Sequence, residues 1–157
     1  MDDNKKASEN VSSQKQYPPL IKTSAKTLSE YIYGLKNILS QVLSKSQNVL
    51  FAYLFGSHIT RIITESSDID LAVYLDKKHP DIDDYLSLHV ALSRALKTDK
   101  IDLLILNNTS NLILLESIVR HGIIVTDKDK DRREAFELYV LHSAIDFREQ
   151  RKAVIGR

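Results

Sequence analysis

Residues 49–70, VLFAYLFGSHITRIITESSDID, decide the fold of this 157-residue chain. The stretch begins with seven consecutive apolar residues, Val49–Phe55, a run too short and too rich in strand-forming side chains for a helix. A second apolar run, Ile69–Leu75, starts as the stretch ends. Strands that are apolar along their whole length occur in sheets that are covered on both faces. The stretch therefore predicts two buried strands of one sheet.

Helical and extended segments alternate on both sides of these strands. Thr27-Leu28-Ser29-Glu30 has the pattern of a capping box, so we expect a helix to begin at Thr27. Apolar residues recur behind it at helical spacing up to Leu43. We expect further helices over 81–97, 111–121 and 131 to about 152, and further strands over 101–106 and 123–125. This alternation predicts an α+β (mixed α/β) fold in which helices flank a sheet.

The length suffices for one domain. Residues 1–19 are polar and end at Pro18-Pro19, so we expect a flexible tail that buries too little to offset its ordering entropy, followed by a single domain over 20–157. The chain has no cysteine, which excludes disulfides, thiol catalysis and cysteine-ligated metal centres.

Charge and hydropathy narrow the functional classes further. The 22 Lys and Arg residues nearly balance the 21 Asp and Glu residues, which argues against a protein held on nucleic acid mainly by bulk charge. The longest apolar runs fall far short of a membrane span, and no signal peptide is visible. We therefore expect a cytoplasmic protein.

Glycine and acidic side chains stand at the ends of the two predicted strands. Gly56 allows the backbone to approach a ligand closely, and Ser57 begins a short helical turn whose amides and hydroxyl can hold phosphate oxygens. Asp68 and Asp70 lie two residues apart in an extended segment, so both carboxylates point to one face. Such a pair is repulsive without a cation, and Mg²⁺ binds one or two carboxylates together with substrate phosphates.

Asp102 adds a third carboxylate from an otherwise apolar strand. An unpaired charge there would be costly to bury, so we expect a metal shared with Asp68 and Asp70, rather than a pair with Lys100 or an arginine. Three carboxylates on two strands suit the two metal ions of an in-line nucleotidyl transfer. The same residues also admit a purely structural interpretation, in which the acidic pair caps a strand and the Gly-Ser pair forms a plain turn.

Gly56-Ser57, ten further residues, Asp68-x-Asp70 and then Asp102 on a later strand together resemble the nucleotidyltransferase superfamily of the DNA polymerase β type. The small size resembles the minimal nucleotidyltransferases. Two segments near the end, Glu137-Leu138-Tyr139 and Asp146-Phe147-Arg148, are similar to the MntA-type antitoxins of type VII (HEPN/MNT) toxin–antitoxin systems. The resemblance covers about residues 27 to 150 and implies the nucleotidyltransferase fold, a mixed β-sheet flanked by helices.

The resemblance implies an Mg²⁺-dependent protein adenylyltransferase that uses two ions. It would move AMP from ATP to a hydroxyl, expected to be a tyrosine, of a cognate HEPN-domain RNase toxin, and release pyrophosphate. The toxin would be a partner in a hetero-oligomer, with no direct contact to nucleic acid or membrane. By position, the resemblance assigns the triphosphate to Gly56 and Ser57, Mg²⁺ to Asp68 and Asp70, and the catalytic metal and activation of the attacking hydroxyl to Asp102.

The chain departs from the family pattern directly after the Gly-Ser pair. The family often continues Gly-Ser-x-Ala-Arg-Gly, whereas this chain has Thr60-Arg61 at the corresponding place. The arginine is displaced by one residue, about 100° around a helix. Arg61 stays a candidate contact for the phosphates.

Two alternatives from other functional classes stay open. The chain could neutralise its partner by binding alone, with a vestigial nucleotide site, or it could transfer a nucleotide to a small molecule. We interpret His58 as a solvated surface residue rather than a phosphate ligand. Arg132 and Arg133, in an alternating charged run, fit a solvated helix start, with contact to an acidic partner or the nucleotide as the alternative.

Overall fold

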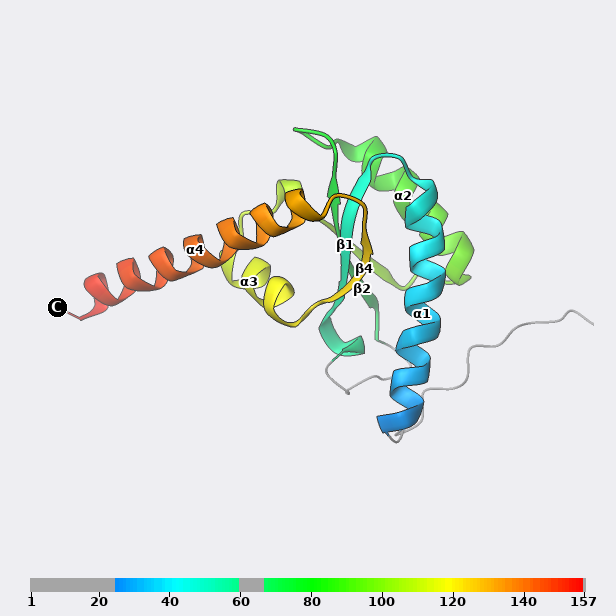
Figure 1. Ribbon diagram of the computed structural model, residues 1–157, viewed down its shortest axis with the longest axis horizontal. Coiled ribbons are helices and arrows are strands. Elements are labelled where there is room, and N and C mark those ends of the chain that lie inside the picture. Colours follow the sequence, from blue (N-terminus) through cyan, green and yellow to red (C-terminus); the bar gives the residue numbers. More distant parts are fainter. Residues whose placement is uncertain (1–24, 60–66, 157) are drawn as a thin grey trace, which may run out of the picture.

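The computed structural model describes residues 25–59 and 67–156. Four helices and four strands alternate along this part of the chain, together with two short 3₁₀ turns (Figure 1). Their bounds are α1 Ala25–Lys45, β1 Val49–Phe55, η1 Gly56–His58, β2 Ile69–Leu75, α2 Ile82–Leu96, β3 Ile101–Ile105, η2 Leu106–Asn108, α3 Leu112–His121, β4 Ile123–Asp127 and α4 Lys130–Ile155. The predicted tail over 1–19 lies outside the described residues, so the division into tail and domain stays a prediction.

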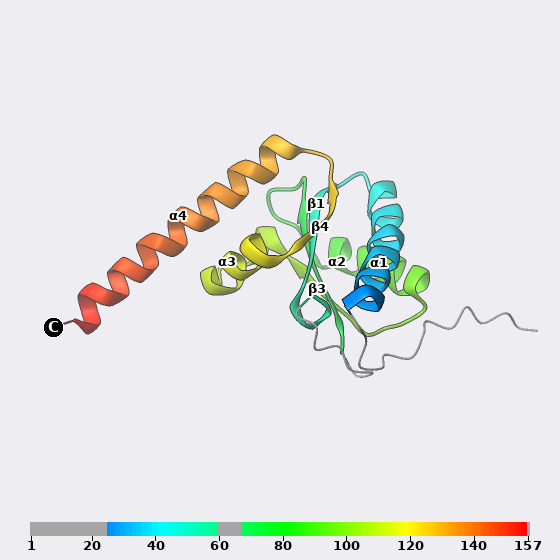
Figure 2. The same ribbon diagram turned by 60° about the horizontal axis from the view of Figure 1, so that its bottom comes forward.

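The four described strands form one mixed sheet in the order β3-β2-β1-β4. β1 is antiparallel to both β2 and β4, whereas β2 and β3 run parallel. α1 and α2 pack on one face of the sheet, and α3 with the first half of α4 packs on the other (Figures 1 and 2). The predicted mixed sheet flanked by helices is confirmed, and the two central strands have the predicted bounds.

Successive side chains of β1 point to opposite faces of the sheet. Ala52 and Leu54 join the core under α1 and α2, while Phe51 and Tyr53 join the core under α3 and α4. All four side chains are buried, which explains why the strand is continuously apolar. The first two helices complete their side of the core with leucines at helical spacing: Leu35, Leu39 and Leu43 of α1, and Leu88, Leu92 and Leu96 of α2.

Helix starts follow the local sequence signals in most cases. Asp81 and Asn111 cap α2 and α3 through their side chains, and Asp81 forms a capping box with Asp84. The predicted start at Thr27 is wrong, because α1 begins at Ala25 and Thr27 is its third residue. The Ala and Lys that precede Thr27 are strong helix formers, so the helix extends past the expected cap.

A partly buried polar network fixes the start of α4 against the sheet. Arg133 donates from Nε to Asp127 Oδ2 at the end of β4 (2.8 Å) and from Nη1 to Glu137 Oε1 one turn later (2.7 Å). Tyr53 of β1 donates its hydroxyl to the same Glu137 oxygen at 2.6 Å. The interpretation of Arg133 as solvated, or as a contact for a partner or nucleotide, is therefore wrong, whereas Arg132 is exposed.

Electrostatics within this network favour the charged arginine and the neutral tyrosine. Burial opposes the charge on Arg133, but its hydrogen bonds to Glu137 and Asp127 outweigh burial, so its pKa is raised. Burial and the hydrogen bond to Glu137 raise the pKa of Tyr53, so its hydroxyl stays a donor.

α4 has 26 residues, yet neither it nor any other described helix combines the length and apolar character needed to span a membrane.

Replacing Arg133 by alanine would leave Asp127 and Glu137 as partly buried carboxylates without a cation. We expect the free energy of unfolding to fall by about 3 kcal/mol, measured by urea denaturation followed by circular dichroism. Arg132→Ala, at an exposed position next to it, is the matched control and should change that free energy by no more than about 0.5 kcal/mol. Equal effects of the two substitutions would show that the network does not anchor α4.

Candidate active site

The candidate site begins where β1 ends, in the turn Gly56–His58. Gly56 has a φ of +73°, a left-handed conformation that glycine adopts without steric cost. A Cβ added to Gly56 would collide with the Oδ2 atom of Asp70. Two independent features therefore require glycine at this position: the left-handed backbone conformation and the Asp70 carboxylate, which occupies the space of a Cβ.

The register of the sheet brings two of the predicted carboxylates together. Asp70 of β2 is level with Asp102 of β3 on one side and with Phe55 of β1 on the other. Ile69 and Leu71 enter the core under α1 and α2. Because side chains alternate along a strand, Asp70 and Asp102 project from the opposite face, the side of α3 and α4.

The three predicted metal ligands differ in exposure. Asp70 is half-buried, whereas Asp68, directly ahead of β2, and Asp102 are exposed. The inference that burial of Asp102 demands a cation is therefore wrong, because water reaches its carboxylate. Among the residues that the structure describes, no three His, Asp or Glu side chains are grouped closely enough to hold a metal ion. The observed core of the site is the pair Asp70 and Asp102.

Burial and like charge act together on this pair. Burial and the neighbouring Asp102 carboxylate raise the pKa of Asp70, while the backbone of Ser57 and the ring of His58 oppose the rise. A cation beside both carboxylates would remove the repulsion. The oxygen donors fit Mg²⁺, which typically keeps several waters and takes its remaining ligands from substrate phosphates rather than from a complete protein cage.

His58 is a residue of the site that the sequence interpretation missed. It is 1% exposed, so its interpretation as a solvated surface residue is wrong. Its Nδ1 lies 3.3 Å from the hydroxyl of Tyr31 on α1, and the two rings stack with centroids 5.9 Å apart. Burial lowers the pKa of His58, and the backbone of Ser67 and the Asp70 carboxylate offset this only in part. His58 thus links the turn to α1.

Arg61 lies outside the described residues, so its predicted contact with the triphosphate stays a prediction. Of the other predicted residues, Gly56, Ser57, Asp70 and Asp102 meet at one end of the sheet, with Asp68 two residues before Asp70.

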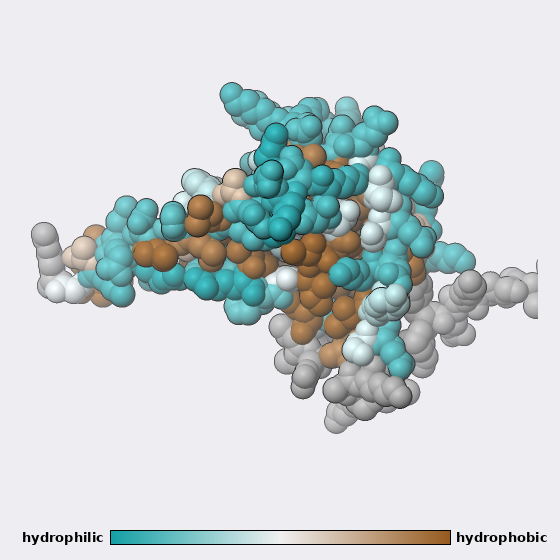
Figure 3. Space-filling view, viewed as in Figure 1, coloured by the Kyte–Doolittle hydropathy of each residue, from teal (hydrophilic) through white to brown (hydrophobic). Residues whose placement is uncertain are grey.

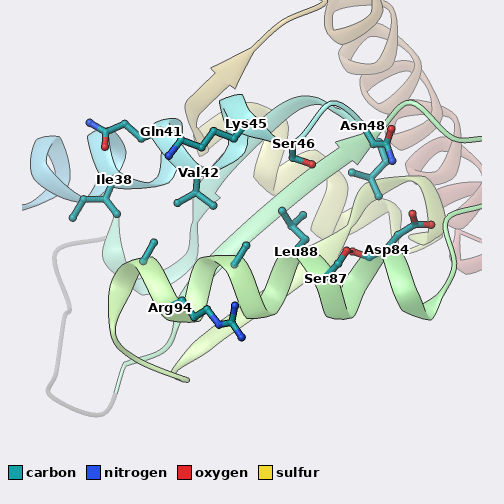
Figure 4. A pocket seen from close by; sticks show the side chains of 13 residues that line it. Ile38, Gln41, Val42, Lys45, Ser46, Asn48, Asp84, Ser87, Leu88 and Arg94 are labelled. Carbon is teal, nitrogen blue, oxygen red and sulfur yellow. The ribbon is translucent and has the colours of Figure 1, made fainter.

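A separate groove of about 760 Å³ lies between α1 and α2. Figure 4 shows Lys45 of α1 and Leu88 of α2 among the side chains that line it. Asn48 and Leu75 also line the groove, which places it at the start of β1 and the end of β2. That is the end of the sheet opposite to Asp70, so the groove and the candidate active site are distinct places.

Gly56→Ala tests the close approach of the turn to Asp70. The added methyl group would displace the carboxylate and strain the left-handed backbone, so we expect the free energy of unfolding to fall by about 1–2 kcal/mol in thermal or urea denaturation. Gly34→Ala is the matched control, since nothing lies within 4 Å of the added Cβ. It should raise that free energy by up to about 1 kcal/mol, as expected for glycine in a helix interior. A Gly56→Ala variant as stable as the unaltered protein would contradict the geometry.

Several solved structures similar to this chain are toxin–antitoxin complexes. A chain of a crystal structure of a toxin–antitoxin with AMP-PNP is 26% identical, with a TM-score of 0.63, and the match covers 77% of this chain and 95% of that one. A chain of the tri-AMPylated Shewanella oneidensis HEPN toxin in complex with MNT antitoxin is 25% identical, with a TM-score of 0.60, covering 79% and 95%. A chain of the crystal structure of the MntA-HepT toxin–antitoxin shares the fold. It is 24% identical, with a TM-score of 0.60, and the match covers 79% of this chain and 96% of that one.

No curated protein matches the chain. The family described as "Polymerase beta, Nucleotidyltransferase" matches residues 37–131, more than half of the chain. The matched range contains the Gly56 turn, both strands that carry the carboxylates, and Asp102 itself. Gly56, Asp70 and Asp102 thus all lie within the matched range. The chain belongs to the polymerase β nucleotidyltransferase family.

Proposed function

We propose that this chain is the antitoxin of a toxin–antitoxin pair, and that it transfers AMP from ATP to a hydroxyl, expected to be a tyrosine, of a HEPN-domain toxin. The observation that carries the proposal is the adjacency of Asp70 and Asp102 beside Gly56. Membership of the nucleotidyltransferase family supports the reaction type. The similar structures support the partner and the nucleotide, since one contains AMP-PNP and another a tri-AMPylated HEPN toxin.

The proposed reaction is an in-line displacement at phosphorus. The toxin hydroxyl oxygen bonds to the α-phosphorus of ATP, the bond from that phosphorus to the bridging oxygen breaks, and pyrophosphate leaves. The hydroxyl proton needs an acceptor, and we assign this role to Asp102, whose carboxylate is exposed to an incoming hydroxyl. Asp70 is half-buried against Gly56, which fits it to hold a cation rather than to meet the acceptor.

The remaining residues would hold the nucleotide in place. Mg²⁺, as two ions, would be held by Asp68, Asp70 and Asp102 together with phosphate oxygens, and it supplies positive charge against the negative charge of the triphosphate. The backbone of the turn at Gly56 and Ser57 would meet phosphate oxygens, with Arg61 as a further positive charge. A polypeptide hydroxyl is the acceptor that the relatives favour over a small molecule.

Neutralisation by binding alone is the second candidate function. The observation that favours it is the number of apolar side chains exposed along α4, which include Leu138, Ile145 and Ile155. Such a surface is suited to a protein partner irrespective of any chemistry at Asp70.

Asp70→Asn separates the two functions. Intact mass of the purified toxin, after incubation with this protein, ATP and Mg²⁺, should rise by one AMP unit or a multiple. We expect Asp70→Asn to slow the gain in mass by more than about 100-fold. Substituting a residue that merely hydrogen-bonds to a metal ligand already lowers activity by about 10–100-fold, and Asp70 is a proposed ligand itself. Asp99→Asn, an exposed carboxylate in the loop before β3, should leave the rate unchanged.

Loss of folding would not explain that result. The pKa of Asp70 is raised in the folded chain, so its charge disfavours the folded state at neutral pH, where the residue is ionised when unfolded. Asp70→Asn should therefore unfold at a temperature no lower than the unaltered chain. An Asp70→Asn variant that adds AMP at the full rate would overturn the proposal; an unchanged toxin mass with a stable complex would favour neutralisation by binding.

A further inference from the structure

α4 carries a repeating seam of residues that begins in the core. The seam consists of residues at alternating steps of four and three: Arg133, Glu137, Val140, Ala144, Phe147, Arg151 and Val154. This spacing keeps all of them on one face of the helix, as in a coiled coil. In the first half of α4 that face packs on the domain, and Val140 and Ala144 are 0% and 3% exposed.

The same face continues beyond the domain. Phe147 is 37% exposed, Val154 78% and Ile155 71%. Figures 1 and 2 both show the second half of α4 extending away from the sheet towards the C-terminal end. In Figure 3 apolar surface runs from the body of the molecule along this helix. Exposed apolar side chains gathered on one part of a helix indicate an interaction surface.

Basic side chains flank the exposed part of the seam. Arg148, Arg151 and Lys152 line a shallow hollow of about 510 Å³ together with Ile155 and the end of the helix. Arg148 is paired with Glu116 and Lys152 with Glu149 on this chain, so Arg151 carries the charge argument. The guanidinium of Arg151 lies over the ring of Phe147, 5.9 Å from its centroid. The exposed part of the seam therefore combines the apolar side chains of Phe147, Val154 and Ile155 with the positive charge of Arg151, and its complement is an apolar surface with acidic side chains at its edge.

We propose that the distal seam, defined as Phe147, Arg151 and Val154 together with the adjacent Ile155, docks an amphipathic helix of the toxin with an apolar stripe and acidic flanks. The identity of the partner rests on the proposed function. The heptad spacing selects a helix, because side chains of one helix fill the spaces between those of the other at this repeat. A second copy of the chain is a poorer occupant, because pairing two such seams would bring the Arg151 guanidinium groups of the two copies together.

The position of the seam gives it a role in the reaction. The Arg133 network fixes α4 to β1 and β4, the same sheet that holds Asp70. A toxin helix on the distal seam would therefore be held at a fixed place relative to the candidate active site. Docking on α4 would thus restrict transfer to hydroxyls that the docked toxin presents to Asp102.

The test compares two double substitutions in full-length protein. Val154→Glu with Ile155→Glu places two carboxylates on the distal seam, and Leu86→Glu with Val90→Glu places two on exposed apolar positions of α2. We expect the first to weaken binding of the purified toxin by at least about 30-fold in calorimetric titration, as for an interface hot spot. The control should stay within about threefold. Arg151→Glu should also weaken binding, by repelling the acidic flanks.

The affinity for the toxin tests the docking proposal independently of AMP transfer. Asp70→Asn should bind the toxin with the affinity of the unaltered chain. If the unaltered chain binds the toxin but adds no AMP, the proposed transfer is refuted, while the affinities of the seam variants still test the docking proposal. Unchanged toxin affinity in both seam variants, with unfolding midpoints preserved, would overturn the docking proposal. So would light scattering that shows the chain alone to be a dimer, which the seam substitutions dissociate without loss of toxin affinity.

Discussion

The parallel register between β2 and β3 holds two carboxylates side by side that would otherwise separate. Asp70 and Asp102 are level with each other, and the apolar residues next to them, Ile69, Leu71 and Leu103, are buried on the opposite face of the sheet. A slip of one residue would bury the carboxylates and expose those apolar side chains, so burial fixes the register strongly. The core thereby maintains a repulsive arrangement of carboxylates, which the proposed cation would relieve.

The glycine turn and α4 both depend on the same sheet. Gly56 approaches Asp70 closely because β1 and β2 are antiparallel neighbours, with Phe55 level with Asp70. α4 starts from the far edge strand, β4, and is tied back to the central strand through Tyr53 and Glu137. One rigid sheet thus positions the candidate chemistry at one end of β1 and β2 and directs α4 away from the domain.

Much of the fold could be predicted from the sequence because local signals agreed with tertiary burial. Val49–Phe55 is apolar throughout because both faces of the sheet are covered, and this pattern is visible without a structure. Gly56 and Asp70, which the motif assigned to one site, lie against each other, whereas Asp68 joins no group of three potential metal ligands among the described residues. The start of α1 was predicted wrongly because Thr27 and Glu30 have the sequence pattern of a capping box. The helix begins at Ala25 instead, since the Ala and Lys before Thr27 are strong helix formers.

The remaining errors concern exposure, which composition does not determine. Asp102 lies on an edge strand that water reaches, and Arg133 is buried because Asp127 and Glu137 surround it. His58 is polar in sequence but lies beneath Tyr31 of α1, a contact between residues 27 positions apart. Each of these outcomes depends on which element covers which, and only the packed structure supplies that information.

Binding of a non-hydrolysable ATP analogue, titrated by calorimetry with and without Mg²⁺, tests most directly whether Asp70 and Asp102 form a cation-dependent nucleotide site. We expect binding that requires Mg²⁺ and that is lost when Asp70→Asn and Asp102→Asn are combined. Binding of equal strength in the absence of Mg²⁺, or in the doubly substituted chain, would show that the paired carboxylates are not the centre of the site.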